Sequence, residues 1–432
     1  MPREIPDCPS EKPNPPRGTP RSYDIELITP MFGGGVKPRV TDPSFSIRPT
    51  AIRGQLQFWW RATVGAQHAA LNDLREAHSD IWGSTERASS VQVLVENVRA
   101  SELVPCARYE KQGDRFRSMP SWNSPFSGQT NALHYAIFPF KGRLSKDRTK
   151  IEEEPASSIM KATFRLTLRC PSSVWSQVEL AVRAWINFGG IGSRTRRGCG
   201  ALYCQGLSPT RSETLAEWFK TFGPTSTAVR MWPTLRLTPL VRNETQQPLT
   251  AWERLIAMYR FFRQGVDFAR NPGPGRSRYP EPETIRRITQ RRMHRHVPWD
   301  DMPDGFPRAE LGLPIVFHFK DEDKDEPPTT TLNPFVDGKA LERMASPLIL
   351  KPLALEDKTA IPLILCLNTP GVQQVELQDD GKNSLTPRHA VPIQDRAFAV
   401  EGSPLHGLTS NGSALEAFLA FAREEGFAEV MQ

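Results

Sequence analysis

The segment Thr163–Cys204 reads TFRLTLRCPSSVWSQVELAVRAWINFGGIGSRTRRGCGALYC and contains the clearest succession of elements in the chain. Over Thr163–Cys170 apolar residues alternate with polar or basic ones, which predicts a strand with one core face and one basic face. From Val174 to Trp185 apolar residues recur at helical spacing. A glycine-rich basic loop, Gly189–Gly200, follows, and Ala201–Cys204 predicts a short strand. This order of strand, helix, loop and strand decides how we interpret the residues around it.

The residues before this segment extend the same pattern. Period-two alternation over residues 23–27 predicts a strand, an apolar stripe over residues 50–64 predicts a helix, and residues 91–95 predict another strand. The stretch from about 100 to 160 is rich in Pro, Ser and Arg, holds one apolar patch at 135–140, and is interpreted as an insertion. Without the insertion the order is strand, helix, strand, strand, helix, strand, which is the ferredoxin-like order of RNA-recognition sheets.

A second unit begins after about residue 230. Capping-box patterns at Thr250–Glu253 and Ser413–Glu416 predict the starts of two amphipathic helices. Strand-like runs recur between them at 313–319, 348–350 and 361–367. We therefore predict an α+β protein of two tandem ferredoxin-like domains with long insertions.

The predicted domain boundaries follow from these units. Residues 1–21 are proline-rich and polar, which indicates a flexible arm. The first domain then spans 22–230 and the second spans 231–432. Within the second domain, residues 263–296 carry nine arginines against three acidic residues and are expected to form a solvated basic loop. Residues 321–326 are expected to form an acidic turn.

The composition limits the class of protein. The chain has 432 residues with 55 Lys and Arg against 48 Asp and Glu, a mild formal net charge of +7, so the clustering of arginines matters more than their total. Six cysteines form no CxxC pair, and no apolar run approaches the roughly 18 residues of a membrane span. We expect a cytoplasmic protein with reduced thiols, no membrane contact, no metal site and no cofactor.

The glycine-rich loop is the most specific local signal. Five glycines allow close backbone approach and positive φ, and three arginines within four positions supply cations, so the loop suits phosphate. The loop follows a helix and precedes a strand, whereas dinucleotide and P-loop sequences follow a strand and open a helix. An ordinary glycine-terminated helix with a solvated basic turn is the alternative. The predicted loop residues are Gly190, Gly192, Arg194, Arg196, Arg197 and Gly198.

We predict that Thr50 caps the helix of residues 50–64. A second face of this helix carries cationic, amide and indole side chains. Arg53, Trp60 and Arg61 share it with Gln57, and Arg48 extends the basic surface just before the helix. Guanidinium groups hold phosphates and an indole can stack on a base, so this face is a candidate RNA surface. The alternative is that Trp60 packs under another element while the arginines are merely solvated.

No catalytic arrangement is evident. An acid-base ribonuclease needs a histidine or paired carboxylates near the phosphate, and none of the eight histidines lies within either basic motif. His68 and His78, which flank the end of the predicted helix, are the least implausible candidates. The sequence therefore predicts a protein that binds without catalysis.

Three motifs together resemble one family. Residues 28–35 (ITPMFGGG), 52–61 (IRGQLQFWWR) and 188–198 (FGGIGSRTRRG) are similar to the N-terminal motifs of the first subunit of the Cmr complex, the type III-B CRISPR effector. That subunit belongs to the RAMP (repeat-associated mysterious protein) superfamily. In the second half, residues 343–350 (RMASPLIL) resemble a short element of the family's C-terminal domain.

The resemblance implies a non-catalytic RNA-binding subunit in antiviral defence. Its expected partners are the guide RNA near its 3′ end, the paired target RNA, and other RAMP subunits at the distal end of the effector. Carried over by position, the candidate RNA-facing residues are Arg48, Arg53, Trp60 and Arg61 with the loop residues named above. Gln57 departs from the family pattern, since many relatives of this helix carry a basic residue there.

Two other functions remain open on the sequence. One is a RAMP endoribonuclease that processes precursor guide RNA with His68 or His78. The other is a structural adaptor that uses apolar surfaces only for protein contacts.

Overall fold

The computed structural model describes residues 18–35, 37, 39–42, 46–120, 132–210, 215–223, 229–272, 276–293, 298–299, 302, 304–320, 325–385, 391–392, 403–408 and 413–430. The mixed α+β class is confirmed. The arm expected over residues 1–21 lies outside the described residues except for 18–21, and Arg21 already belongs to the first strand.

The first unit contains six elements in the predicted order: β1 (Arg21–Leu27), α1 (Pro49–Ala62), β3 (Gln92–Ala100), β10 (Ala162–Arg169), α4 (Trp175–Phe188) and β11 (Leu202–Cys204). The strands form one sheet in the order β11-β1-β10-β3, and each neighbouring pair is antiparallel. The alternation predicted for β10 is confirmed, because Phe164, Leu166 and Leu168 are buried between more exposed residues. These side chains share a hydrophobic core with α1 and α4.

The second unit repeats this arrangement. Its elements are β12 (Thr234–Val241), α6 (Pro248–Gln264), β16 (Leu348–Ala354), β17 (Ala360–Asn368), α8 (Ala414–Glu424) and β20 (Ala428–Glu429). The sheet order is β16-β17-β12-β20, again with antiparallel neighbours. In both sheets the unit's first strand lies between its third and fourth, and the second strand is at an edge. The two halves therefore share one sheet topology.

The second sheet lies between the helices of both units. On one face, Ile349 and Leu353 join the core that contains α1 and α4. On the other, Leu348 and Leu350 join the core that contains α6 and α8. Because both faces are covered, β16 is buried at every residue and β17 carries a continuous apolar run instead of an alternating one.

Helix starts were predicted with mixed success. Helix α1 begins at Pro49 with Arg48 as its N-cap, so the predicted cap at Thr50 is wrong. Helix α6 begins at Pro248, two residues before the expected capping box. In both cases proline fits the first helical turn, where its missing N–H has no intrahelical partner to lose. At α8 the prediction is confirmed, since the Ser413 side chain accepts a hydrogen bond from the Glu416 N–H.

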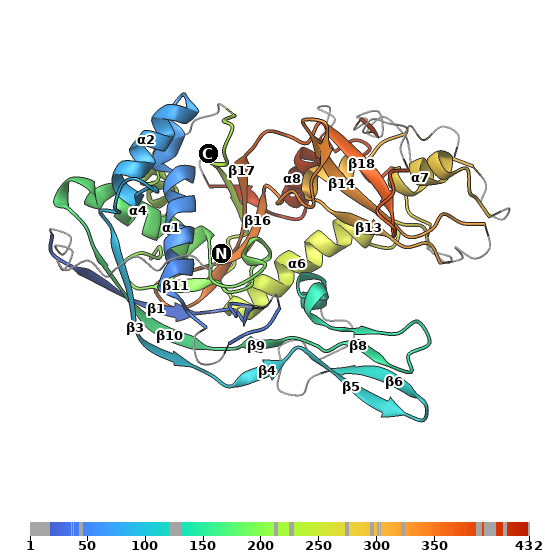
Figure 1. The fold of residues 1–432 in the computed structure, drawn as a ribbon, viewed down its shortest axis with the longest axis horizontal. Helices are drawn as coiled ribbons and strands as arrows, with labels where there is room; N and C mark the ends of the chain where they lie inside the picture. Colours follow the sequence, from blue (N-terminus) through green and yellow to red (C-terminus); the bar gives the residue numbers. More distant parts are fainter. Residues whose placement is uncertain are drawn as a thin grey trace, which may run out of the picture.

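The insertion is more regular than its composition suggested. Strand β9 (Ser157–Ile159) pairs with β4 (Leu103–Pro105) and with β2 (Met31–Phe32). Two hairpins, β5–β6 (Ala107–Gln112 and Arg115–Pro120) and β7–β8 (Arg143–Leu144 and Ile151–Glu153), extend beneath the second half in Figure 1. The predicted apolar patch packs through the short helix α3 (Leu133–Ala136) against α6.

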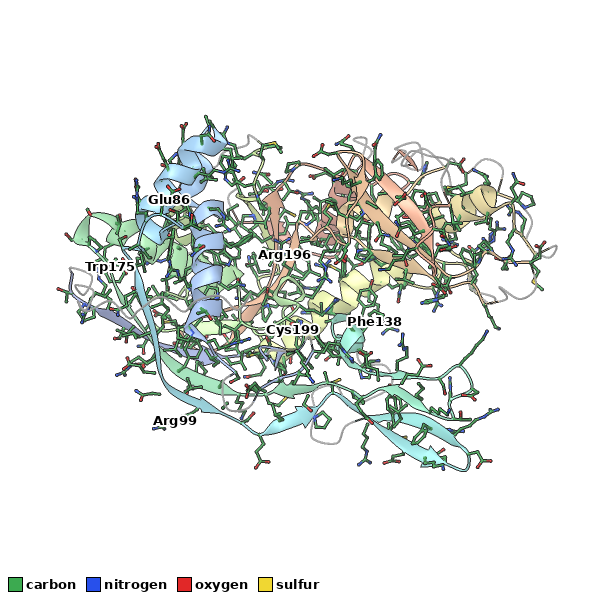
Figure 2. The ribbon with its side chains drawn as sticks, in the orientation of Figure 1. Glu86, Arg99, Phe138, Trp175, Arg196 and Cys199 are labelled. Atoms are coloured by element: carbon green, nitrogen blue, oxygen red, sulfur yellow. The ribbon has the colours of Figure 1, made fainter. Side chains whose placement is uncertain are left out.

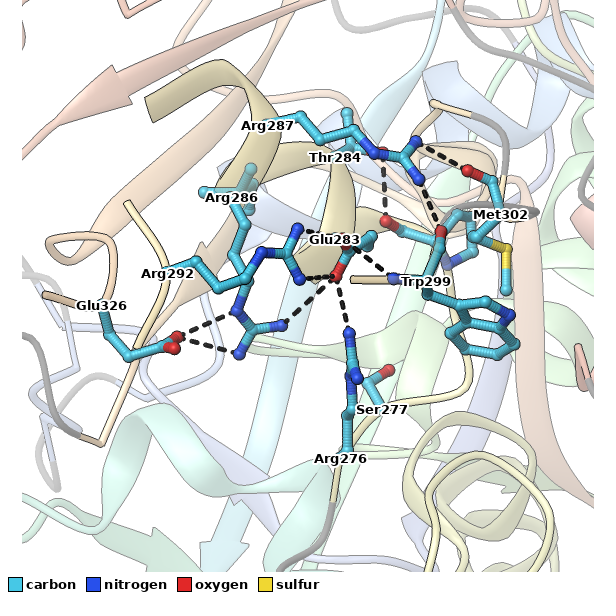
Figure 3. Close-up of polar contacts among 12 residues, drawn as sticks. Arg276, Ser277, Glu283, Thr284, Arg286, Arg287, Arg292, Trp299, Met302 and Glu326 are labelled. Carbon is cyan, nitrogen blue, oxygen red and sulfur yellow. Dashed lines mark hydrogen bonds and ion pairs between the residues drawn. The ribbon is translucent and has the colours of Figure 1, made fainter. Parts of the chain in front are cut away.

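The prediction that residues 263–296 form a solvated basic loop is wrong. Residues 263–296 contain helix α7 (Glu281–Thr289), whose Glu283 is 2% exposed and receives Arg276 at 2.8 Å and Arg292 at 3.0 Å (Figure 3). Arg286 pairs with Glu326 at 2.9 Å, so the end of the predicted acidic turn is also buried. Buried carboxylates order these arginines, a long-range pairing that local sequence does not reveal.

Further elements are a third large sheet in the second half and two helices in the first half. A further sheet comprises β13 (Ile315–Phe317), β14 (Thr330–Val336), β15 (Lys339–Ala340), β18 (Gln374–Asp379) and β19 (Val391–Pro392). Helices α2 (Leu71–Trp82) and α5 (Leu215–Lys220) complete the first half. Among the described residues no helix is long and apolar enough to cross a membrane, and no group of His, Cys, Asp and Glu in that part of the chain is suited to hold a metal ion.

Candidate nucleic-acid interface

The glycine-rich loop is held by protein backbone on both sides. The Ser193 N–H donates to the Phe32 carbonyl at 2.8 Å, and the Gly200 N–H donates to the Pro30 carbonyl at 2.9 Å. Within the loop, the Ile191 N–H donates to the Gly200 carbonyl at 3.0 Å. These three N–H groups are therefore not available to a phosphate.

The predicted need for glycine is explained by close protein contacts. Gly192 and Gly198 have φ of +79° and +82°, in the left-handed region that favours glycine. A Cβ at Gly192 would lie 2.4 Å from the Phe32 carbonyl oxygen, one at Gly198 would lie 2.5 Å from the Trp252 ring, and one at Gly190 would lie 2.5 Å from the Gly200 carbonyl oxygen. The loop is thus packed tightly between the first motif and the second unit.

Two of the three loop arginines join the halves of the molecule. Arg196 donates to the Ser346 carbonyl, and Arg197 donates to the carbonyls of Leu348 at 2.9 Å and Leu311 at 3.3 Å. Figure 2 shows Arg196 in the centre of the molecule, where the two halves meet. Burial and the neighbouring Arg197 lower the pKa of Arg196 to about 10. These contacts give both arginines an architectural role.

A buried lysine reinforces the same junction. Lys351 on β16 is fully buried, and its Nζ donates to the carbonyls of Ile186 at 2.6 Å and Gly189 at 2.7 Å, at the end of α4. Burial lowers the pKa of this ammonium well below its ordinary value. The carbonyls at the end of a helix otherwise lack intrahelical partners, so Lys351 satisfies part of that need.

Beside this junction lies a groove of about 1020 Å³. It is bounded by α3 and the residues after it, the glycine-rich loop, the end of α6, and the segments 308–318 and 343–346. None of the described residues that line it is acidic. Its eight Lys and Arg side chains are Lys141, Arg194, Arg196, Arg197, Arg260, Arg263, Arg308 and Arg343. We call this feature the basic groove.

Four cations of the basic groove have no hydrogen bond or ion pair with any residue that the structure describes: Lys141, Arg194, Arg260 and Arg343. The others are engaged inside the protein, as in Arg308, which pairs with buried Glu281 at 3.0 Å. Exposed aromatic surface accompanies the cations, since Phe138 is 71% exposed. Unpaired cations beside an aromatic ring suit a polyanion with planar groups, which is the chemistry of a nucleic acid.

The face of α1 that was predicted to bind RNA is only partly exposed. Trp60 is 0% exposed and its indole N–H donates to Gln177 Oε1 at 3.1 Å, so its predicted stacking on RNA is wrong. It packs under other elements because α2 and α4 cover that side of α1. Arg53 donates to the Trp82 carbonyl and Arg61 approaches His78 Nε2 at 3.2 Å. Both arginines stay half-exposed, and their contact with RNA remains a prediction.

Arg48 has a structural partner as well. Its guanidinium donates to the carbonyls of Gly34 and Gly35, which fixes the glycine turn of the first motif against the start of α1. On the basic face predicted for β10, Arg165 also has an internal partner, since it binds Asp24 through two hydrogen bonds of 2.9 and 3.0 Å.

Local sequence missed most of the basic groove. Lys141 and Phe138 lay in the presumed insertion, Arg260 lay on a helix interpreted only through its apolar side, and Arg343 lay in a weak motif. These segments are far apart in the chain, and tertiary contacts such as that between α3 and α6 bring them together.

The candidate nuclease histidines lie elsewhere. His78 on α2 faces Trp60, with ring centroids 5.8 Å apart, and neither His68 nor His78 is among the residues that line the basic groove. Burial, Arg61 and Arg53 lower the pKa of His78 to about 4.

Comparison with known proteins shows which family the first unit resembles. The family model of the RAMP superfamily matches residues 24–203, which run from β1 to β11 and include all three motifs of the first half. The first unit is therefore similar to proteins of the RAMP superfamily.

The chain also resembles a Cmr subunit, as its motifs predicted. It is 27% identical over 191 residues to the CRISPR system Cmr subunit Cmr1-2 of Pyrococcus furiosus, across 43% of this chain and 95% of that protein. The crystal structure of Cmr1 from Pyrococcus furiosus in its apo form matches with a TM-score of 0.49 and 15% identity over 95% of this chain and 98% of that one. A chain of type III-B Cmr-beta bound to cognate target RNA and AMPPnP in the presence of ssDNA matches with a TM-score of 0.46 and 11% identity, covering 94% and 99%.

Proposed function

We propose that this protein is a non-catalytic RNA-binding subunit of a type III-B CRISPR effector of the Cmr type, acting in the cytoplasm with guide RNA, target RNA and other RAMP subunits as partners. The similarity to the Cmr subunit Cmr1-2 supports the place in such an effector. The two sheets of equal strand order support the interpretation of each half as a ferredoxin-like unit.

The observation that carries the RNA-binding proposal is the charge of the basic groove. Eight cations line it without a carboxylate among the described lining residues, and four of them lack any partner in that part of the chain. Cations left unpaired by their own protein are free to neutralise phosphates and release counterions, which is the main source of affinity for nucleic acid. In this proposal the loop residues Gly190, Gly192, Gly198, Arg196 and Arg197 shape the groove wall, while Arg194 faces the RNA.

A double variant tests this proposal. Arg260→Gln with Arg343→Gln removes one unpaired cation from each of two walls of the groove. We expect RNA affinity to fall about ten- to a hundredfold and the slope of log K against log salt to decrease by about 1.4, since each single-strand phosphate contact contributes about 0.7. Binding of a labelled RNA by the full-length protein, measured by fluorescence anisotropy at several salt concentrations, checks both numbers.

Arg61→Gln tests the other predicted RNA surface in parallel, because that cation lies on α1 beside His78. An unchanged salt slope in the double variant would contradict the groove as the RNA site. A loss for Arg61→Gln equal to that of the double variant would instead place the interface on α1. The effector assignment has a separate test: Cmr-type subunits and a guide RNA should co-purify with the chain from its own cell.

A further inference from the structure

A second groove, of about 1110 Å³, lies between α6, the end of α8 and the segment 242–246 that follows β12. We call it the α6–α8 groove. Its lining residues on α6 include Thr250, Glu253, Ala257 and Phe261, which recur every three or four residues and therefore share one side of the helix. This side is about 16 Å long, or three helical turns. The basic groove uses another side of α6, and among the described residues the two grooves share none.

The lining of the α6–α8 groove is largely apolar and aromatic. Met258, Phe421 and Phe427 line it and are themselves nearly buried. Phe261 is 44% exposed, although its ring stacks on Phe421 with centroids 6.2 Å apart and lies 5.6 Å from the Phe268 ring. The exposed part of this ring is therefore held in place by other rings, which is typical of an aromatic anchor at a protein interface.

The charged residues that line the α6–α8 groove are two arginines and three glutamates. Arg242 and Arg254 both bind Glu244, and Arg242 also donates to the Glu425 carbonyl at 3.0 Å, so both cations are engaged. Glu253 and Glu425 are exposed, and their carboxylates have no hydrogen bond or ion pair with any residue that the structure describes. The charge left unpaired is therefore negative, which suits a cationic partner and does not suit RNA.

Two walls of this groove are helices, whose backbone groups are hydrogen-bonded within α6 and α8. These walls offer no backbone partners to an extended segment, whereas a bound helix satisfies its own backbone. We propose that the α6–α8 groove takes a basic amphipathic helix of a partner protein, with its apolar side chains on Phe261 and Met258 and its Lys or Arg side chains at Glu253 and Glu425. Helix-in-groove recognition uses anchors at spacings of three and four residues, as on α6. The proposal holds whether or not the basic groove binds RNA.

The probe is a labelled amphipathic peptide of leucine and lysine, about 18 residues or five helical turns long. A second peptide carries glutamine in place of each lysine. In fluorescence anisotropy the full-length protein should bind the lysine peptide about tenfold more tightly than the glutamine peptide. Phe261→Gln should weaken binding of both peptides about tenfold, because both lose the aromatic anchor. Glu253→Gln with Glu425→Gln should abolish the preference for lysine and leave binding of the glutamine peptide unchanged.

Matched controls make the same changes outside the α6–α8 groove. Phe138→Gln removes another exposed aromatic ring, and Glu86→Gln with Glu102→Gln removes two other exposed carboxylates. Both control variants should bind the two peptides as the wild-type protein does. Thermal melts of every variant confirm that it is folded.

Three results would overturn the proposal. One is the absence of lysine-peptide binding by the wild-type protein, and another is wild-type binding by Phe261→Gln or a lysine preference that survives the double glutamate substitution. The third is a wild-type protein that self-associates in analytical ultracentrifugation while Phe261→Gln is monomeric, since a second copy of the chain would then occupy the groove. RNA affinity should be unchanged by Phe261→Gln, so failure here leaves the proposed function intact. A loss of RNA affinity in that variant would assign the groove to RNA and contradict the proposal.

Discussion

Two arginine-rich regions of this molecule differ in what faces their guanidinium groups. Around α7, Arg276, Arg286 and Arg292 converge on Glu283, and Arg286 also pairs with Glu326 (Figure 3). In the basic groove, eight cations meet no carboxylate among the described lining residues. The first region is a closed ionic cluster, whereas in the second four of the eight cationic side chains have no internal partner among the described residues.

The difference shows that the number of arginines does not identify a nucleic-acid surface. The segment 263–296 has the densest arginines in the sequence, yet those around α7 are engaged by buried carboxylates and stabilise the fold. The groove draws its cations from scattered segments and leaves four of them unpaired. The number of unsatisfied cations is the informative quantity.

The largest expected effect is a loss of stability when the carboxylate of the ionic cluster around α7 is removed. Glu283→Gln removes the buried carboxylate shared by Arg276, Arg286 and Arg292, of which Arg286 keeps Glu326, and should lower the free energy of unfolding by about 3–5 kcal/mol. Burial raises the pKa of Glu283, but Arg292 and Arg276 outweigh it and the net pKa is lowered. Urea denaturation measures the loss, with the exposed Glu86→Gln as control.

The sign of the pH dependence follows from the lowered pKa. The wild-type protein should lose the stability that this carboxylate contributes as pH falls below the ordinary glutamate range, and the variant should lack that part of the acid transition. An unchanged stability in Glu283→Gln would show that the two regions do not differ as described.

An intermediate effect should follow from adding a carboxylate to the basic groove. Gln264 lines the groove near the end of α6, four residues after Arg260, so Gln264→Glu gives that cation an internal partner. We expect RNA affinity to fall about tenfold, which is about 1.4 kcal/mol, while stability changes by less than about 0.5 kcal/mol. RNA anisotropy and urea denaturation measure the two quantities.

Gln373→Glu makes the same charge change at an exposed position outside the groove. Equal losses of affinity for both variants would indicate a dependence on net charge alone. That outcome would remove the distinction between the groove and the rest of the surface.

The smallest expected effect is on the pH dependence of stability. It arises at His78, whose ring lies beside Arg61 in a third arginine environment. Because burial, Arg61 and Arg53 lower the pKa of His78 to about 4, the folded protein takes up this proton at lower pH than the unfolded chain does. Stability should be fully present above about pH 6.5 and decline as pH falls towards 4, by about 1 kcal/mol after allowance for partial hydration of the ring.

His78→Gln removes the titration but keeps an acceptor for Arg61. The variant should show a flatter melting temperature between pH 4 and 7 than the wild-type protein. The same variant tests the nuclease alternative, since cleavage of repeat RNA that is abolished by His78→Gln would show that this surface, and not the basic groove alone, acts on RNA.

Much of the first unit was predictable, because its signals are local. The alternation of β10, the stripe of α1 and the glycine-rich loop each occupy one continuous segment, and the structure places all of them as expected. Predictions failed where a residue's partner lies far along the chain. Trp60 was assigned to a ligand because no local feature announces that Gln177 accepts from its indole.

The sequence by itself determined the elements, their order in the first unit, the RAMP motifs and the positions that require glycine, because periodicity and backbone conformation depend on near neighbours. The tertiary structure alone decided which cations remain unpaired. Arg196 and Arg197 reach carbonyls 150 and 151 residues away along the chain, whereas the Nε of Arg194 next to them finds no acceptor among the described residues. A guanidinium is available to a ligand only when the fold has not already supplied its acceptor, and that depends on the packing of the two halves.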